Sequence, residues 1–232
     1  HMTPDELALG YDWLYRRLRD GGHLARMLAD EQLPDSVAQK ALQFIMLAYL
    51  AGREPLEGEG SELIQGILCQ MKPEVISQLC WFVWTLHGDL DDEGRARARD
   101  LWLAASERIA GDQASHAIAL SNLNFLASAL NVLDDETVDA WKKAAPYAND
   151  AHHAPHLVKE FARLAPMYPV AVGEIFLASL ERFVPTYDEE DIVSCVKSIA
   201  RAGHQDLAEA ICRTYADKGS TMLNETYLEI RA

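Results

Sequence analysis

The sequence lacks any apolar run long enough to cross a membrane. No stretch approaches the roughly 18 to 20 consecutive apolar residues that a membrane-spanning helix requires. The start of the chain also lacks the basic and then apolar layout of a signal peptide. We therefore expect a soluble cytoplasmic protein that has no membrane partner.

Positive charge is also scarce. The chain has 21 Lys and Arg residues against 36 Asp and Glu residues, which gives a formal net charge of −15. Such a chain repels a phosphate backbone unless its basic residues gather on one face. The two short basic clusters, 16–19 and 95–99, each stand beside an aspartate and are interpreted as solvated helix faces. We therefore expect no nucleic-acid partner.

Motifs that carry known chemistry are missing as well. The four cysteines show neither a CxxC motif nor a disulfide framework, and each stands in an apolar, helix-like context: Cys69, Cys80, Cys195 and Cys212. No GxxxxGK[ST] phosphate loop, GxGxxG turn after a strand or GxSxG elbow is present. We predict buried thiols, no cofactor and no catalytic residue, although a pair of carboxylates could come together without a sequence signature.

Helix signals, in contrast, follow one another with almost no strand signals between them. Caps, first-turn prolines and closing glycines predict a helix over 4–20, a short one over 23–31 and a third that ends at Ala51. From Ser61 onward the predicted helices form pairs. These pairs are 61–71 with 74–87, 92–110 with 113–132, 135–148 with 155–165, 169–183 with 188–202, and 204–218 with 220–230.

An acidic opening recurs along the chain. Leu90–Glu93 returns as Leu133–Glu136, and a third acidic opening stands at Asp188–Glu190. The strides of 43 and about 53 residues are typical of an antiparallel helix pair with its turns. The acids have a local role, because first-turn Asp and Glu cap free amides. We predict an all-α fold, a right-handed α-solenoid of antiparallel helix pairs similar to HEAT and armadillo superhelices.

The domain organisation is predicted to be simple. Residues 1–2 look like a vector remnant, and 3–232 are predicted to form one helical-repeat domain. The Gly- and Pro-containing stretch 54–60 is interpreted as a surface loop. The alternative is a hinge, which would divide the chain into 3–54 and 61–232.

Two predicted helices are apolar on every side. The runs 44–51 and 79–84 distribute apolar residues around the whole helix. We interpret both as central core. The alternative is a contact surface built on Trp81, Phe82 or Trp84, because tryptophan is enriched at binding hot spots.

One histidine cluster could hold a metal ion. His152, His153 and His156 stand within a few residues of Asp150, and zinc takes such ligands. However, Pro155 favours the first turn of a helix and pushes Ala154 towards an extended conformation, which would separate the first two histidines from the third. We interpret the segment as a polar turn between helices, with a metal-dependent hydrolase as the alternative.

From about Trp81 onward the chain resembles a known group of helical regions. The matching features are acidic openings followed by Trp102 and Trp141, the segment 161–166 before Tyr168–Pro169, the stretch 175–181, and the closing 217–219. They resemble the C-terminal HEAT-like helical region of large bacterial STAND-type NTPases and related phage-defence proteins. The resemblance implies a sensor that binds a foreign protein, while the nucleotide site and the effector lie upstream in those proteins.

These observations lead to an expected function. We expect a non-catalytic protein-recognition module of a bacterial defence system, whose partner is a basic or foreign protein of phage or toxin origin. The alternative is a stand-alone acidic immunity protein or adaptor that binds a basic partner.

Overall fold

The computed structural model describes residues 34, 36, 49, 50, 88, 90–109, 117–126, 130, 132–148 and 153–232. Regular secondary structure within these ranges is helical, without a strand. No helix among them is both long and apolar enough to span a membrane. The helices are α6 (Asp92–Ile109), α7 (Ala117–Leu126), α8 (Asp135–Ala144), η4 (Ala145–Tyr147), α9 (His153–Leu164), α10 (Pro169–Ser179), α11 (Glu189–Arg201), α12 (Gln205–Asp217) and α13 (Asn224–Arg231).

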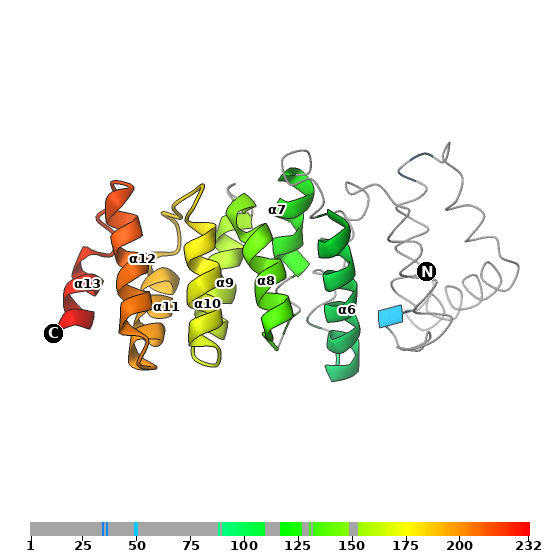
Figure 1. Ribbon diagram of the computed structural model, residues 1–232, viewed down its shortest axis with the longest axis horizontal. Coiled ribbons are helices and arrows are strands. Elements are labelled where there is room, and N and C mark those ends of the chain that lie inside the picture. The colour runs from blue at the N-terminus through cyan, green and yellow to red at the C-terminus, as the bar shows by residue number, and fades with distance from the viewer. Residues whose placement is uncertain are drawn as a thin grey trace, which may run out of the picture.

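The helices are arranged in two rows. In the first row α6 packs on α8, α8 on α10 and α10 on α12; in the second, α7 packs on α9, α9 on α11 and α11 on α13. Contacts such as α6 with α7, α10 with α11 and α12 with α13 join the rows. Figure 1 shows the first row as four helices side by side, with α9 and α11 behind it. The predicted all-α fold is confirmed.

The repeat length differs in part from the one predicted. Helices of the first row begin at residues 92, 135, 169 and 205, which are 43, 34 and 36 residues apart, and those of the second row at 117, 153, 189 and 224, which are 36, 36 and 35 residues apart. The predicted stride of 43 residues is the spacing of α6 and α8, whereas the predicted stride of about 53 is wrong, because the third acidic opening belongs to the other row. Asp92 and Asp135 open α6 and α8 of the first row, whereas Asp188 precedes α11 of the second.

The acidic openings also differ in what they do. Asp134 caps α8 through a hydrogen bond from the Thr137 amide, while the Thr137 hydroxyl accepts one from the Asp134 amide. Asp91 accepts a hydrogen bond from the amide of Gly94 at the start of α6. Asp188 has a left-handed backbone with φ of +56° and forms no capping hydrogen bond through its side chain. The predicted capping role is therefore confirmed at α6 and α8 and wrong for Asp188.

Glycines end two of the helices. Gly203 after α11 has φ of +91°, and Gly219 after α12 has φ of +83°. The amide that follows each glycine bonds five residues back, from His204 to Ile199 and from Ser220 to Tyr215. This pattern is the Schellman motif, which glycine favours because it has no Cβ to oppose a positive φ. The predicted ends of these helices, 202 and 218, lie within one residue of those observed.

The helix predicted over 169–183 ends at Ser179 as α10, and two other predicted helices are also too long. The prediction over 113–132 passes the end of α7 at Leu126, whereas 132–134 lead in non-helical backbone to the cap at Asp134. The prediction over 135–148 is α-helical only to Ala144 and continues as the 3-10 helix η4. Pro146 explains this second change, because proline has no amide to donate within an α-helix.

A run of aromatic rings joins four helices from the two rows. Trp141 of α8 lies 5.8 Å from Phe161 of α9, and Phe161 lies 5.0 Å from Phe176 of α10, measured between ring centroids. Phe176 meets Tyr215 of α12 edge-on at 6.3 Å. The Tyr215 hydroxyl donates a hydrogen bond to the carbonyl of Pro185. We name these four side chains the aromatic spine; all are fully buried, where such contacts add to the hydrophobic gain.

The side chain of Asn124 joins α7 to α8 within the core. Its amide nitrogen donates to the carbonyl of Ala144 at 3.1 Å, and its carbonyl oxygen accepts from the indole N–H of Trp141 at 3.1 Å. The indole N–H of Trp102 in α6 donates to the carbonyl of Leu123, one residue earlier in α7. Helix α7 therefore satisfies the buried N–H groups of two tryptophans.

We predict that Asn124→Ala lowers the free energy of unfolding by about 2 to 4 kcal/mol, because it leaves a buried N–H and a buried carbonyl without partners. Ser121→Ala is the matched control on the same helix. The Ser121 hydroxyl is buried and makes no hydrogen bond within the described structure, so its removal should be neutral or stabilising. Urea denaturation followed by circular dichroism measures both; equal losses would contradict the role given to Asn124.

Gly173 sets the approach of α10 to α12. A Cβ at this position would lie 2.3 Å from Cδ2 and 2.7 Å from Cγ of Leu207. We predict that Gly173→Ala lowers stability by about 1 kcal/mol, since overpacking outweighs the gain in helix propensity. In a Leu207→Ala background the same change should raise stability by about 1 kcal/mol. A double-mutant cycle in urea tests this; a gain of equal size in both backgrounds would show that the close approach has no cost.

Candidate functional site

The candidate contact residues Trp81, Phe82 and Trp84 lie outside the described residues. So do two of the four cysteines, Cys69 and Cys80. From the other apolar run, Tyr49 and Leu50 are described, and both are buried. The prediction that 44–51 belongs to the core is confirmed at these two positions.

The histidine candidates are partly described. His152 lies outside the described residues, whereas helix α9 begins at His153 and includes His156 one turn later. The expectation that Pro155 keeps Ala154 extended is wrong, because Ala154 is helical. Proline fits there because first-turn amides have no partner within the helix. Over the part of the chain that is described, no group of three or more His, Cys, Asp or Glu side chains is placed to hold a metal ion.

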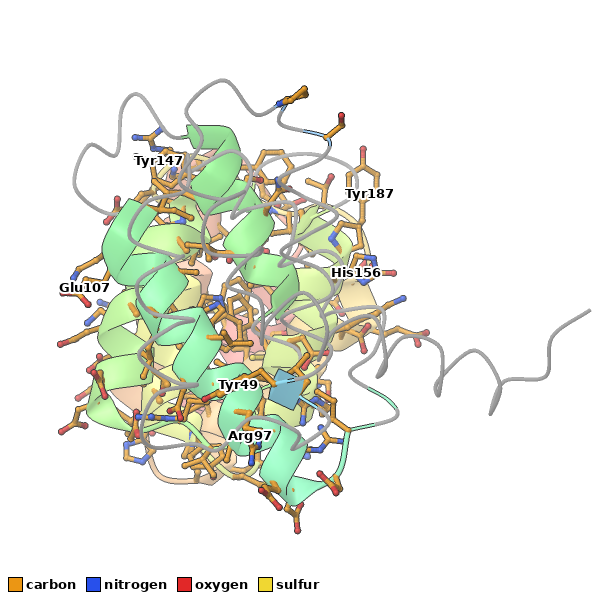
Figure 2. All side chains as sticks on the ribbon, turned by 90° about the vertical axis from the view of Figure 1, so that its right-hand side faces the viewer. Tyr49, Arg97, Glu107, Tyr147, His156 and Tyr187 are labelled. Carbon is orange, nitrogen blue, oxygen red and sulfur yellow. The ribbon has the colours of Figure 1, made fainter. Side chains whose placement is uncertain are left out.

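A groove runs between α6 and α8, with α7 beneath it. It encloses about 680 Å³, which is within the range of ligand-binding clefts. Figure 2 shows Glu107 of this groove on one side of the molecule and His156 on the opposite side. The floor is apolar and consists of Leu103, Ala104, Leu120, Leu123 and Ala140, and the rim is charged and consists of Arg99, Asp100, Glu107, Glu136, Asp139 and Lys143. We call this feature the α6–α8 groove.

Arg99 forms a network of ion pairs at one end of the α6–α8 groove. Its guanidinium pairs with Asp134, with Glu136 at 3.2 Å and with Asp100 at 3.5 Å. Burial opposes the charge of Arg99, but the contacts with Asp134 and Glu136 outweigh it and raise the pKa of Arg99. Burial likewise opposes the charge of Asp134. The hydrogen bonds from Thr137 and the ion pair with Arg99 together outweigh this effect and lower the pKa of Asp134. Both shifts favour the charged forms of Arg99 and Asp134.

The rest of the rim has charges that are not paired. Among the described residues, Glu107 on α6 and Asp139 on α8 form no ion pair, and neither does Lys143 one turn beyond Asp139. Ser106 of α6 also lines the groove. Its side chain is 94% buried, since its exposed fraction is 6%, and its hydroxyl makes no hydrogen bond. The rim contains four carboxylates and two cations, a formal charge of −2.

The basic cluster 95–99 is not the solvated face that the sequence predicts. The side chain of Arg97 is only 4% exposed, donates to Glu93 at 2.7 Å and stacks over the ring of Tyr49. Figure 2 shows Arg97 next to Tyr49. The error has a physical reason, because an arginine can bury its stem and stack its planar guanidinium on an aromatic ring.

The two described cysteines are inert by environment. Cys195 and Cys212 are free and buried, which confirms the prediction for them. Burial raises the pKa of Cys195 to about 12. Burial, with a contribution from the charge of Glu209, raises the pKa of Cys212 to about 11.

We predict that both thiols react with iodoacetamide at pH 8 at least about a hundredfold more slowly in the folded protein than in urea, because the thiolate is the reactive form. Peptide mapping by mass spectrometry reads out each site. The raised pKa values of the two thiols also lower the stability of the folded protein at high pH. Above the ordinary thiol pKa of 9.0 the unfolded chain ionises its thiols while the folded chain does not, so stability falls. Rapid alkylation of the native protein would contradict the burial.

We compared the chain with models of protein families, with curated proteins and with solved structures. None of the three comparisons found a match. The α6–α8 groove must therefore be judged by its own chemistry. Its described lining has no histidine or cysteine, and two carboxylates without ion-pair partners, Glu107 and Asp139, stand above an apolar floor.

Sequence reasoning missed this groove. Its walls come from helices whose first residues, Asp92 and Asp135, are 43 residues apart, and no local motif marks Glu107 or Asp139. The only available signal was the i, i+3, i+7 spacing of Glu136, Asp139 and Lys143, which places them on one side of α8.

Proposed function

We propose that this protein is a non-catalytic protein-recognition module, built as a right-handed α-solenoid of antiparallel helix pairs of the HEAT or armadillo kind. One observation carries the proposal. Each helix packs on the next helix of its own row, and successive helices of a row begin 34 to 43 residues apart. Arrays of this kind present extended surfaces that bind other proteins.

The charge of the chain determines which partners it favours. The net charge is −15, and the rim of the α6–α8 groove has a formal charge of −2. Complementary charge steers association and rejects partners of like charge. The proposed partner is therefore a protein with a basic surface.

The resemblance to the helical region of STAND-type NTPases supports a narrower proposal. Trp102 and Trp141, which contribute to that resemblance, are fully buried and hydrogen-bonded to α7. They stabilise the array and are unsuited to direct contact with a partner. In those proteins the helical region is a sensor, and we propose that the partner here is likewise a foreign protein made during phage infection.

The test uses the full chain, immobilised without a His tag, as bait in lysates of uninfected and phage-infected bacteria. We predict that one basic protein is captured from the infected lysate. Once purified, this protein should form a complex of defined stoichiometry with the chain in size-exclusion chromatography. Raising salt should weaken the complex, because exposed charges are screened.

Two results would contradict the proposal. One is a captured component that turns out to be nucleic acid. The other is the absence, in both lysates, of any protein that reconstitutes a complex after purification.

A further inference from the structure

We infer that the α6–α8 groove binds a basic peptide segment of the partner, in which an aliphatic side chain covers the leucine floor and a lysine or arginine reaches Glu107 and Asp139. This inference rests on the proposed function, since it names the contact site of a protein-recognition module. Three observations support it: the division of charge along the rim, the state of Ser106, and the size of the groove.

The charges of the rim are paired in one part and unpaired in the rest. At one end of the groove, Arg99 forms ion pairs with Asp100, Asp134 and Glu136. Beyond that end, Glu107 on the α6 wall and Asp139 on the α8 wall form no ion pair within the described structure. A cationic side chain that enters the groove therefore has an unpaired carboxylate available on each wall. Lys143 stands one turn beyond Asp139, but carboxylates outnumber cations on the rim as a whole, which disfavours an anionic segment.

Ser106 points to a ligand independently of this charge. Its hydroxyl is buried in the lining and has no hydrogen-bond partner in the described structure. An unpaired buried hydroxyl is unfavourable, because it has lost water and gained nothing in return. An ammonium or guanidinium group in the groove would supply a donor for it, since both carry several N–H groups and no acceptor.

The dimensions of the groove fit a short segment. Its α6 wall extends from Arg99 to Glu107, a length of about 12 Å at the rise of an α-helix. About three extended residues span that distance. The volume of about 680 Å³ holds side chains as well as backbone. The bound segment therefore consists of three successive residues, basic, aliphatic and basic in that order, within a longer chain.

The probe is a fluorescein-labelled peptide of alternating lysine and leucine, titrated with the full chain by fluorescence anisotropy at physiological ionic strength. A peptide of alternating glutamate and leucine is the negative control. We expect the lysine peptide to bind and the glutamate peptide not to bind. Equal affinity for both peptides would overturn the inference.

Two double variants separate groove binding from general attraction to an acidic protein. Glu107→Gln with Asp139→Asn removes two charges from the groove. Glu181→Gln with Asp217→Asn removes two exposed charges outside it, at positions after α10 and at the end of α12. We expect the groove variant to lose at least about tenfold in affinity for the lysine peptide and the control less than about twofold. Equal losses would show that only net charge matters and would overturn the inference.

Ser106→Ala tests the groove without changing charge. We expect it to weaken peptide binding several-fold while leaving the urea midpoint unchanged or raised, because it removes a hydroxyl that has no partner in the free protein. Unchanged affinity would show that Ser106 does not contact the ligand and would count against the inference.

Using the same variants as bait in the capture experiment distinguishes the two proposals. If the wild-type chain, the groove variant and the control all capture the partner equally, protein recognition stands and the groove assignment fails. If none captures a partner, the proposed function itself fails. Loss of capture by the groove variant alone supports both.

Discussion

The contact between Phe161 and Phe176 lies at the centre of the aromatic spine, and the positions of the other helices depend on it. These rings come from α9 and α10, which belong to different rows, and they continue to Trp141 on one side and Tyr215 on the other. Removing one such ring from a core costs about 3 to 5 kcal/mol. The spine therefore holds α8, α9, α10 and α12 in fixed positions.

The α6–α8 groove depends on this core through α8. Trp141 of α8 belongs to the aromatic spine, and its indole N–H donates a hydrogen bond to Asn124 of α7. The same helix presents Glu136, Asp139 and Lys143 to the groove. The opposite wall is fixed in the same way, because the indole of Trp102 in α6 is bonded to Leu123 of α7. Packing therefore sets the shape of the groove, and the ion pairs of Arg99 with Asp134 and Glu136 join the two walls at one end.

Local signals in the sequence account for much of the fold. Caps and turn glycines, such as Asp134 and Gly219, mark helix ends because their effect is confined to a few neighbouring residues. The repeat was misread because the acids before α11 resemble those that open α6 and α8, although Asp188 does not cap its helix. The burial of Arg97 depends on Tyr49, a residue far away in the chain. The groove is likewise a tertiary feature that local pattern cannot reveal.

Hydrogen–deuterium exchange of the full chain, with and without the lysine and leucine peptide, tests the central claim most directly. The account predicts that the peptide slows exchange in α6 and α8, the two walls of the groove, and leaves α11 and α13 unchanged. Exposed acids also occur on α11, at Glu189 and Glu190. Protection at those acids without protection of α6 and α8, or protection spread over every acidic segment, would contradict a specific recognition site in the groove.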